Sequence, residues 1–210
     1  MTDYSVELNN LTKYFGRRLI FNGISFNFTS QNIYGISGPN GSGKSTLVKI
    51  IANLNSATKG KVVHKSGEKL IEPEELHNYI GFVSPYLFLY DEFTAEENLI
   101  HSSRIRGIHY GKEKADHLFN ELNLFDRRND LVRGYSSGMK QRLKFIFALL
   151  HEPQLLIFDE PTSNLDATGK EAVYSIIKNE LKNNLVIIAS NEETDLSLCG
   201  RVIELEQFKS

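Results

Sequence analysis

A glycine-rich stretch in the first quarter of the chain, GPNGSGKST, carries residues suited to holding phosphate groups. It matches the pattern G-x-x-x-x-G-K-[ST], in which glycines let backbone N–H groups close around phosphate oxygens that a Cβ would obstruct. Lys44 adds a positive charge, and the Ser45 hydroxyl is a ligand suited to Mg²⁺. A chance match in a flexible loop is the alternative, which the strand-like run before the stretch and the helical pattern after it disfavour. The residues predicted to bind the nucleotide here are Gly38, Asn40, Gly41, Ser42, Gly43, Lys44, Ser45 and Thr46.

Two neighbouring acids, Asp159 and Glu160, follow the apolar run Leu155–Phe158. In open α/β sheets, ligands bind beyond the carboxyl ends of the strands, which is where these carboxylates would lie. Asp159 is suited to hold Mg²⁺ through its water shell, and Glu160 to polarise the water that attacks a γ-phosphate. A strand that simply ends in solvent is the alternative, but the phosphate-binding pattern in the same chain favours the functional interpretation.

These groups need a scaffold, and the apolar pattern predicts one of the α/β class. Uninterrupted apolar runs are typical of strands buried on both faces of a parallel sheet, and alternation in the N-terminal part predicts further strands. The charged stretch 96–131 is helix-prone, so we expect an α/β core with a helical insertion. Strands are predicted at 5–11, 24–28, 33–36, 80–84, 155–158, 185–189 and 202–205, and helices at 46–54, 139–150 and 169–181.

Composition limits the classes of protein and partner. The chain has 210 residues, enough for one sizeable domain, and its net charge of −2 gives no general attraction to nucleic acid. The single cysteine, Cys199, excludes an internal disulfide. No signal peptide opens the chain, and no apolar run approaches the ~20 residues that a membrane helix needs. We therefore expect a cytoplasmic protein that reaches a membrane only through a partner.

A phosphate loop and an acidic pair also fit kinases, GTPases and helicases. A third segment of the chain distinguishes between these families. The stretch 135–142, YSSGMKQR, resembles the signature motif of ATP-binding-cassette (ABC) ATPases, which usually reads LSGGQ followed by a basic stretch. It lies between the phosphate loop and the acidic pair, as in that family. A serine-capped helix would also explain the string in isolation, but the order of the motifs favours the ABC family.

The resemblance implies roles for further residues. Ser137 and Gly138 would cap the γ-phosphate of ATP held by a second subunit, so that two subunits enclose two nucleotides. The segment SNLD, which ends at Asp166, resembles the D-loop that links the two sites across the dimer. Phe15 falls where the family places an aromatic ring that stacks on adenine; Tyr14, or a role for Phe15 in the core, is the alternative.

The same resemblance implies a fold, a function and partners. The fold would be a P-loop NTPase (RecA-like) with a mostly parallel sheet, an N-terminal antiparallel β-subdomain and an inserted α-helical subdomain. One ABC ATPase domain would span residues 1–210, with its core at 1–84 and 152–210 and its helical subdomain at 85–151. The chain would be the ATP-binding, Mg²⁺-dependent ATPase subunit of an ABC transporter on the inner face of the cell membrane. Its partners would be a second ABC ATPase subunit, in a homodimer or heterodimer, and a transmembrane permease, with no nucleic acid; its compact length resembles exporter-type subunits.

Two positions depart from the family pattern. Pro85 stands where the family places the Q-loop glutamine, and it has no side-chain oxygen for Mg²⁺ or water. Asn191 stands in place of the H-loop histidine; it can donate a hydrogen bond to a γ-phosphate but carries no charge. We expect normal binding of Mg-ATP and slow hydrolysis, with Glu160, Lys44 and Asn191 as the catalytic set. None of the six histidines falls at that strand end, and all are expected on the surface.

Other functions compete with transport. A cassette protein acting in translation or DNA repair is the chief rival, but such proteins usually carry two cassettes or a long coiled-coil insertion, and neither is present in the sequence. A regulatory module that closes on ATP without useful turnover, or the poorer half of a heterodimer, would account for Pro85 and Asn191. The motor of a transporter is favoured.

Overall fold

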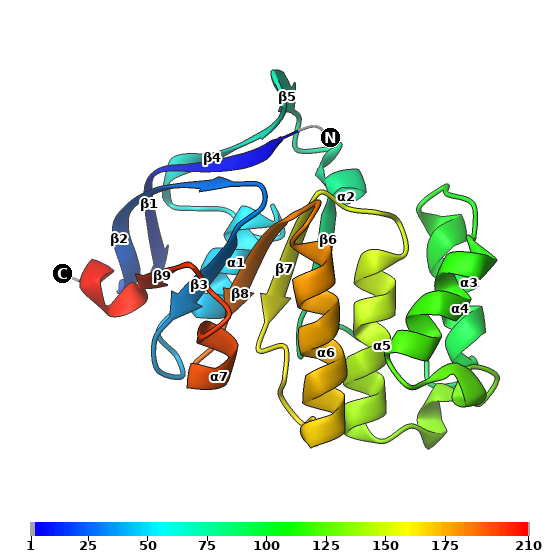
Figure 1. Cartoon of the computed structure of the whole chain (residues 1–210). Helices are drawn as coiled ribbons and strands as arrows, with labels where there is room; N and C mark the ends of the chain where they lie inside the picture. The colour runs from blue at the N-terminus through cyan, green and yellow to red at the C-terminus, as the bar shows by residue number, and fades with distance from the viewer. Residues whose placement is uncertain (1–2, 210) are drawn as a thin grey trace.

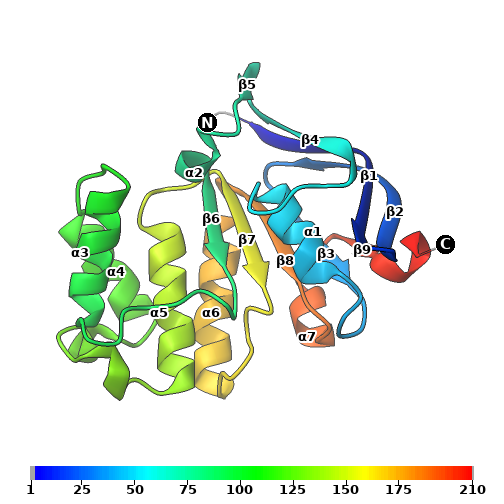
Figure 2. The ribbon, with the colours of Figure 1, turned by 180° about the vertical axis from the view of Figure 1, so that it is seen from behind.

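The computed structural model describes residues 3–209, which form two sheets with helices packed around them (Figure 1). The antiparallel sheet has the order β2-β1-β4-β5, and the parallel sheet the order β6-β7-β8-β3-β9. Helices α3, α4 and α5 lie at the opposite end of the molecule from the antiparallel sheet, as both views show (Figures 1 and 2). The expected fold class, a parallel core with an N-terminal antiparallel sheet and a helical insertion, is confirmed.

The elements have the following bounds. The strands are β1 (Tyr4–Phe15), β2 (Arg18–Thr29), β3 (Ile33–Ser37), β4 (Lys59–Ser66), β5 (Lys69–Ile71), β6 (Ile80–Val83), β7 (Leu155–Asp159), β8 (Leu185–Ala189) and β9 (Arg201–Glu204). The helices are α1 (Lys44–Ile51), α2 (Leu76–Tyr79), α3 (Ala95–Ile105), α4 (Lys112–Glu121), α5 (Ser137–Leu149), α6 (Ala167–Glu180) and α7 (Glu193–Leu196). Short 3₁₀ turns occupy Phe125–Arg127, Val132–Gly134 and Leu205–Phe208.

Strands β1 and β2 form a hairpin whose turn contains Gly16 with φ 58°. They are longer than the strands expected at 5–11 and 24–28, because pairing continues through register shifts to the Phe15–Arg18 pair at the turn. The sequence pattern did not predict β4 and β5. Strand β4 has few fully buried residues, so no apolar pattern indicates it. It is a strand because it pairs with β1, which lies far away in the sequence.

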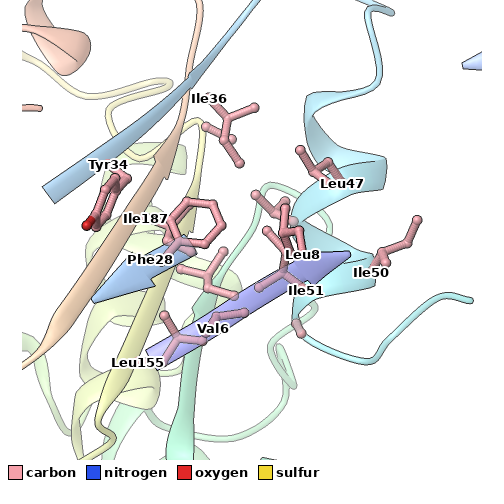
Figure 3. Close-up of a cluster of buried hydrophobic side chains, with 14 of the residues drawn as sticks. Val6, Leu8, Phe28, Tyr34, Ile36, Leu47, Ile50, Ile51, Leu155 and Ile187 are labelled. Carbon is pink, nitrogen blue, oxygen red and sulfur yellow. The ribbon is translucent and has the colours of Figure 1, made fainter. Parts of the chain in front are cut away.

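The central strands β7 and β8 of the parallel sheet are buried on both faces, as their uninterrupted apolar runs predicted. Successive residues of β7 point into two different cores: Leu155 packs with α1 and the antiparallel sheet, and Leu156 packs with α5 and α6. Figure 3 shows the first core, in which Ile51 of α1 and Leu8 of β1 meet Ile187 of β8. This double burial fixes the strand ends that carry the acidic pair.

The helical segment begins with a capped helix. The Glu97 N–H donates to Thr94 Oγ1 (3.1 Å), and the Thr94 N–H donates to Glu97 Oε2 (2.8 Å), which is a capping box at the start of α3. Helices α3, α4 and α5 share one apolar cluster with the second face of the parallel sheet. Helix α5 therefore joins the helical segment to the core. Within residues 3–209, no helix has both the length and the apolar character that crossing a membrane requires.

The expectation that all histidines lie on the surface is wrong for His64, which is 3% exposed. Its Nε2 donates to the Ile51 carbonyl (2.9 Å), so Nδ1 accepts from the Tyr4 hydroxyl (3.0 Å). Burial lowers the pKa of His64 to about 4. His151 is half-buried with its Nε2 3.0 Å from the Ile80 carbonyl, and burial lowers its pKa to about 4 as well. Both rings are held as neutral hydrogen-bond donors.

Candidate nucleotide site

The predicted phosphate loop joins the end of β3 to the start of α1. Gly43 has φ 110° immediately before the helix, and a Cβ at this position would collide with the side chain of Ile20. A Cβ on Gly38 would meet the Ser42 hydroxyl. Both positions therefore require glycine. Because α1 begins at Lys44, its first N–H groups have no carbonyl partner within the helix and form an anion-binding end.

Lys44 lies folded over this loop and is 5% exposed. Its Nζ donates to the Gly38 carbonyl (2.8 Å) and lies 3.3 Å from Oε1 of Glu160. The lysine thus connects the loop after β3 with the strand end after β7. A buried ammonium is costly without partners, so these contacts fix the charge inside the cleft.

Ser45 and Asp159 meet beside this pair. The Ser45 hydroxyl donates to Asp159 Oδ1 (3.0 Å), while Asp159 Oδ2 is buried and has no hydrogen-bond partner. Burial raises the pKa of Asp159, since its ionised form is poorly solvated there. An unpartnered carboxylate oxygen next to a hydroxyl and a phosphate-binding loop fits Mg²⁺, which commonly takes one or two protein oxygens and completes its shell with phosphate and water. The donor set is therefore chemically suited to the predicted metal.

Glu160 has an unusual backbone conformation. Its φ is 50°, in the left-handed region that residues with a Cβ seldom occupy. Its N–H donates to the Ala189 carbonyl (2.8 Å), and Gln141 of α5 donates to the Pro161 carbonyl (3.1 Å) directly after it. These contacts turn the Glu160 side chain toward Lys44.

A cleft of about 690 Å³ opens beside these groups, within the size range of small-molecule sites. It brings together nine residues that the sequence predicted: Phe15, Asn40, Gly41, Gly43, Lys44, Ser45, Thr46, Glu160 and Asn191. It is also lined by Arg18, Ile20, Tyr86, Ser163 and Asn164, which were not predicted from the sequence, and by Pro85, one of the two departures from the family pattern. Arg18 and Ile20 carry no motif, and tertiary packing of β2 on the phosphate loop places them. Ser163 and Asn164 belong to the SNLD segment and could have been included with Asp166.

The remaining predicted residues lie outside the lining of the cleft. Gly38 and Ser42 pack against each other within the loop, and Asp159 is hydrogen-bonded to Ser45. Asp166 caps α6, where its Oδ1 accepts from the Gly169 N–H (2.8 Å). Ser137 and Gly138 begin α5, in which Ser136 is the cap and accepts from the Met139 N–H (3.2 Å). Within one chain, then, the signature segment does not contribute to the cleft.

The two departures from the family pattern both border the cleft. Asn191 lies 3.5 Å from Asn40, from Nδ2 to Oδ1, at the rim of the phosphate loop. Pro85 is held from below by Lys144 of α5, whose Nζ donates to the carbonyls of Ser84 (3.1 Å) and Pro85 (3.0 Å). Burial lowers the pKa of Lys144. The segment that should carry the glutamine is thereby fixed to the signature helix.

Of the two aromatic rings considered for adenine, Phe15 lines the cleft. It is 49% exposed, and the Nζ of Lys13 lies 4.7 Å from its ring centroid. An exposed ring at the mouth of a polar cleft is available for stacking, and a role in the core is excluded by its exposure.

The parallel sheet, the loop before α1 and the acids after β7 together define a P-loop nucleotide-binding protein. Comparison with known proteins makes the class specific: the sequence pattern of the family described as ABC transporter matches residues 21–163. The chain belongs to this family, as its motifs predicted.

Similar proteins agree with this assignment. The chain is 31% identical to the linearmycin resistance ATP-binding protein LnrL of Bacillus subtilis, over 96% of its own length and 66% of that protein. It is 30% identical to the lipoprotein-releasing system ATP-binding protein LolD of Leptospira interrogans, over 98% of its length and 93% of that protein. The chain thus spans about two thirds of the length of LnrL.

Solved structures show the same fold. A putative ABC transporter ATP-binding protein from Pyrococcus furiosus superimposes with a TM-score of 0.84 at 22% identity, covering 98% of this chain and 100% of that one. MJ0796, described as a bacterial ABC transporter cassette in dimeric form, superimposes with a TM-score of 0.82 at 27% identity, covering 95% of this chain and 93% of that one. The chain is therefore an ATP-binding cassette of the ABC type.

Proposed function

We propose that the chain is the ATP-hydrolysing subunit of an ABC exporter, which dimerises around ATP and drives a membrane-embedded partner from the cytoplasmic face. The observation that carries this proposal is that Lys44, Ser45 and Glu160 line one cleft at the phosphate loop, with Asp159 hydrogen-bonded to Ser45 beside it. Such a set serves phosphoryl transfer, in which positioning and charge neutralisation supply most of the catalysis.

Binding of the triphosphate would exchange the partners of Lys44. Its ammonium would leave the Gly38 carbonyl and the Glu160 carboxylate for the β- and γ-phosphates, while the N–H groups at the start of α1 bind phosphate oxygens. Ser45 and Asp159 would hold Mg²⁺, which when bound neutralises charge on the phosphates. Glu160, released from Lys44, would orient the attacking water and accept its proton.

A second subunit would complete the site. Ser137 is exposed and lies at the start of α5, where unpaired N–H groups are suited to an anion. Because this helix end lies outside its own cleft, Ser137 and Gly138 are available to cap the γ-phosphate held by a partner subunit. The similarity to MJ0796, which was solved as a dimer, supports this arrangement. Asp166, close to the segment that lines the cleft, would lie between the two sites.

An apolar groove between the core and the helical segment supports a membrane-embedded partner. It has a volume of about 350 Å³, and aromatic and aliphatic side chains form most of its lining. Phe88 is 91% exposed and Ile105 79% exposed at its edge, far more than is usual for side chains of this kind. We propose that a short apolar helix of the permease inserts here. Membrane attachment should then be lost in Phe88→Asp and kept in Val202→Asp, a matched change at an exposed apolar residue of β9.

Export rather than import rests on the names of similar proteins. LnrL is named for linearmycin resistance, and another relative, 31% identical over 98% of this chain, is a Nod factor export ATP-binding protein of Sinorhizobium fredii. The chain covers 61% of the length of the latter, so the direction of transport and the substrate of this chain are part of the proposal.

The second part of the proposal is that the chain hydrolyses ATP slowly. The alternative is that the chain is a regulatory module or the less active half of a heterodimer. Pro85 offers no side-chain oxygen at the rim of the cleft, and Asn191 offers an uncharged donor beside Asn40. Glu160 is retained, so the chain keeps its proton acceptor while lacking two supporting groups.

The experiment that tests the whole proposal is ATP-driven dimerisation. Glu160→Gln should become dimeric in Mg-ATP by light scattering, because bound ATP is no longer consumed. Glu160→Gln combined with Ser137→Arg should remain monomeric, since the arginine blocks the capping end of α5. A Glu160→Gln chain that binds ATP but stays monomeric at high protein concentration would contradict the dimeric mechanism.

A further inference from the structure

One buried carboxylate outside the predicted site is bound by three hydroxyl groups. Asp195 of α7 is 1% exposed, and its oxygens accept from Thr162 Oγ1 (2.9 Å), Tyr174 Oη (2.8 Å) and Ser190 Oγ (2.7 Å). No basic side chain of residues 3–209 forms an ion pair with it within 4.0 Å. An unpaired buried carboxylate is expensive and is retained where its hydrogen bonds fix a particular arrangement.

Two of the three hydroxyls flank the predicted catalytic positions. Thr162 follows Glu160 by two residues, and Ser190 directly precedes Asn191. Thr162 is 1% exposed and Ser190 is fully buried, so neither can reach solvent instead. Asp195 therefore connects the loop after β7 with the end of β8. The third hydroxyl, that of Tyr174, comes from α6 and lies next to neither catalytic position.

The backbone at Glu160 needs such a connection. A left-handed conformation at a residue with a Cβ costs free energy and persists only where its surroundings enforce it. The Ala189 carbonyl holds the Glu160 N–H from the side of β8, and Thr162 holds the following turn against Asp195. Ser190 also approaches Glu160 directly, with Oγ 3.5 Å from Oε2.

A neighbouring acid does not replace Asp195. Glu192 Oε2 lies 3.5 Å from the Thr162 hydroxyl, farther than Asp195 does, and Lys170 pairs with that oxygen at 2.7 Å. Glu192 and Lys170 are both partly exposed and form an ion pair at the surface. The buried contact that fixes the two strand ends is the one to Asp195.

We propose that Asp195 is a positioning residue for ATP hydrolysis, which holds the strand ends so that the Glu160 carboxylate and the Asn191 side chain face the γ-phosphate. The inference rests on the proposed function, because it assigns a role in the hydrolysis proposed above. The hydrogen bonds of the Asp195 carboxylate go to Thr162, Tyr174 and Ser190 and none to the phosphate loop, so its loss should affect the chemical step and leave ATP binding intact.

The test compares matched variants by turnover, KM, ATP affinity and thermal stability. Asp195→Asn presents N–H donors to the hydroxyls, and it should lower kcat by roughly 10- to 100-fold, the cost of a small misplacement of a catalytic group. The dissociation constant of ATP, measured with a fluorescent analogue, should stay within about twofold of the wild-type value. Thr162→Val should lose turnover likewise, whereas Thr162→Ser, which keeps the hydroxyl, should retain it.

Tyr174→Phe is the control for a purely structural role. It removes one hydroxyl from the same carboxylate but leaves the contacts to Thr162 and Ser190, so stability should fall while kcat stays close to wild type. Equal losses of kcat in Tyr174→Phe and Asp195→Asn would overturn the inference, and so would a folded Asp195→Asn with unchanged kcat. Should Asp195→Asn fail to fold, the comparison of Thr162→Val with Thr162→Ser decides. A wild-type chain that binds ATP and releases no phosphate would refute the proposed hydrolysis itself, and this inference with it.

Discussion

Lys44 and Glu160 form an ion pair across the cleft, with 3.3 Å between Nζ and Oε1. The pair joins the group that would bind the phosphates to the group that would activate water. Neither group can take its proposed role in hydrolysis while it holds the other, so we expect ATP binding to be coupled to release of the Glu160 carboxylate.

Removing either member of the pair should separate binding from hydrolysis. Lys44→Ala should weaken ATP binding by tenfold or more, because the loop loses its only side-chain charge. Glu160→Gln should bind ATP at least as tightly as the wild type, since Lys44 no longer has a carboxylate to leave. Its phosphate release should fall by roughly 10²- to 10⁴-fold, the range for loss of a general base. Titration calorimetry and a phosphate assay measure the two effects; weaker binding in Glu160→Gln would contradict the coupling.

Gly43→Ala should damage the phosphate loop. Its Cβ would meet the Ile20 side chain at a φ of 110°, so the loop must shift, at a cost of roughly 1–3 kcal/mol in the free energy of unfolding. ATP binding should weaken in the same variant. Gly134→Ala is the matched control: a Cβ there has nothing within 4 Å, and stability should change by less than about 0.5 kcal/mol. Thermal unfolding compares the two, and similar melting temperatures would show that the loop tolerates a Cβ.

Restoring the two family groups should accelerate hydrolysis. Pro85→Gln with Asn191→His would return an oxygen ligand and a hydrogen-bonding imidazole to the cleft, and single-turnover hydrolysis should rise by about tenfold or more. Adding Glu160→Gln to this variant should abolish the gain, which confirms that the same carboxylate is used. An unchanged or lower rate in the double variant would remove the account of slow turnover.

Acid should destabilise the fold through His64. The pKa of His64 is lowered to about 4 by burial, below the ordinary value of 6.5, so the unfolded chain takes up a proton first as pH falls. Its contribution to stability is fully present above pH 6.5 and is lost as pH falls toward about 4, with an upper bound of about 3–4 kcal/mol. Urea unfolding at pH 7.5, 6 and 5 should show this loss. His64→Gln should reduce the dependence and leave the part due to His151, whose pKa is also lowered to about 4. His109→Gln, at an exposed histidine, should leave the dependence as in the wild type.

The sequence predicted the parts of the site that local chemistry defines. The phosphate loop and the acids after β7 need particular residue types at fixed spacing, and their flanking apolar runs indicated the parallel sheet. By contrast, Arg18, Ile20 and Tyr86 reach the cleft only through packing between segments far apart in the chain. The burial of His64 depends on the pairing of β4 with β1, and the proposed role of Asp195 depends on hydroxyls from three separate parts of the chain. A single-sequence pattern contains no signal for such contacts.

The hydrogen bonds from Lys144 to the carbonyls of Ser84 and Pro85 link the cleft to helix α5. Lys144 lies in the middle of α5, and its ammonium binds the two residues that follow β6. The same helix begins at Ser137. Because a helix of this length is stiff, a shift of Pro85 at the cleft would also move Ser137 at the start of α5. The orientation of Ser137, which faces the second subunit in the proposed dimer, would then depend on whether the cleft of its own subunit holds ATP.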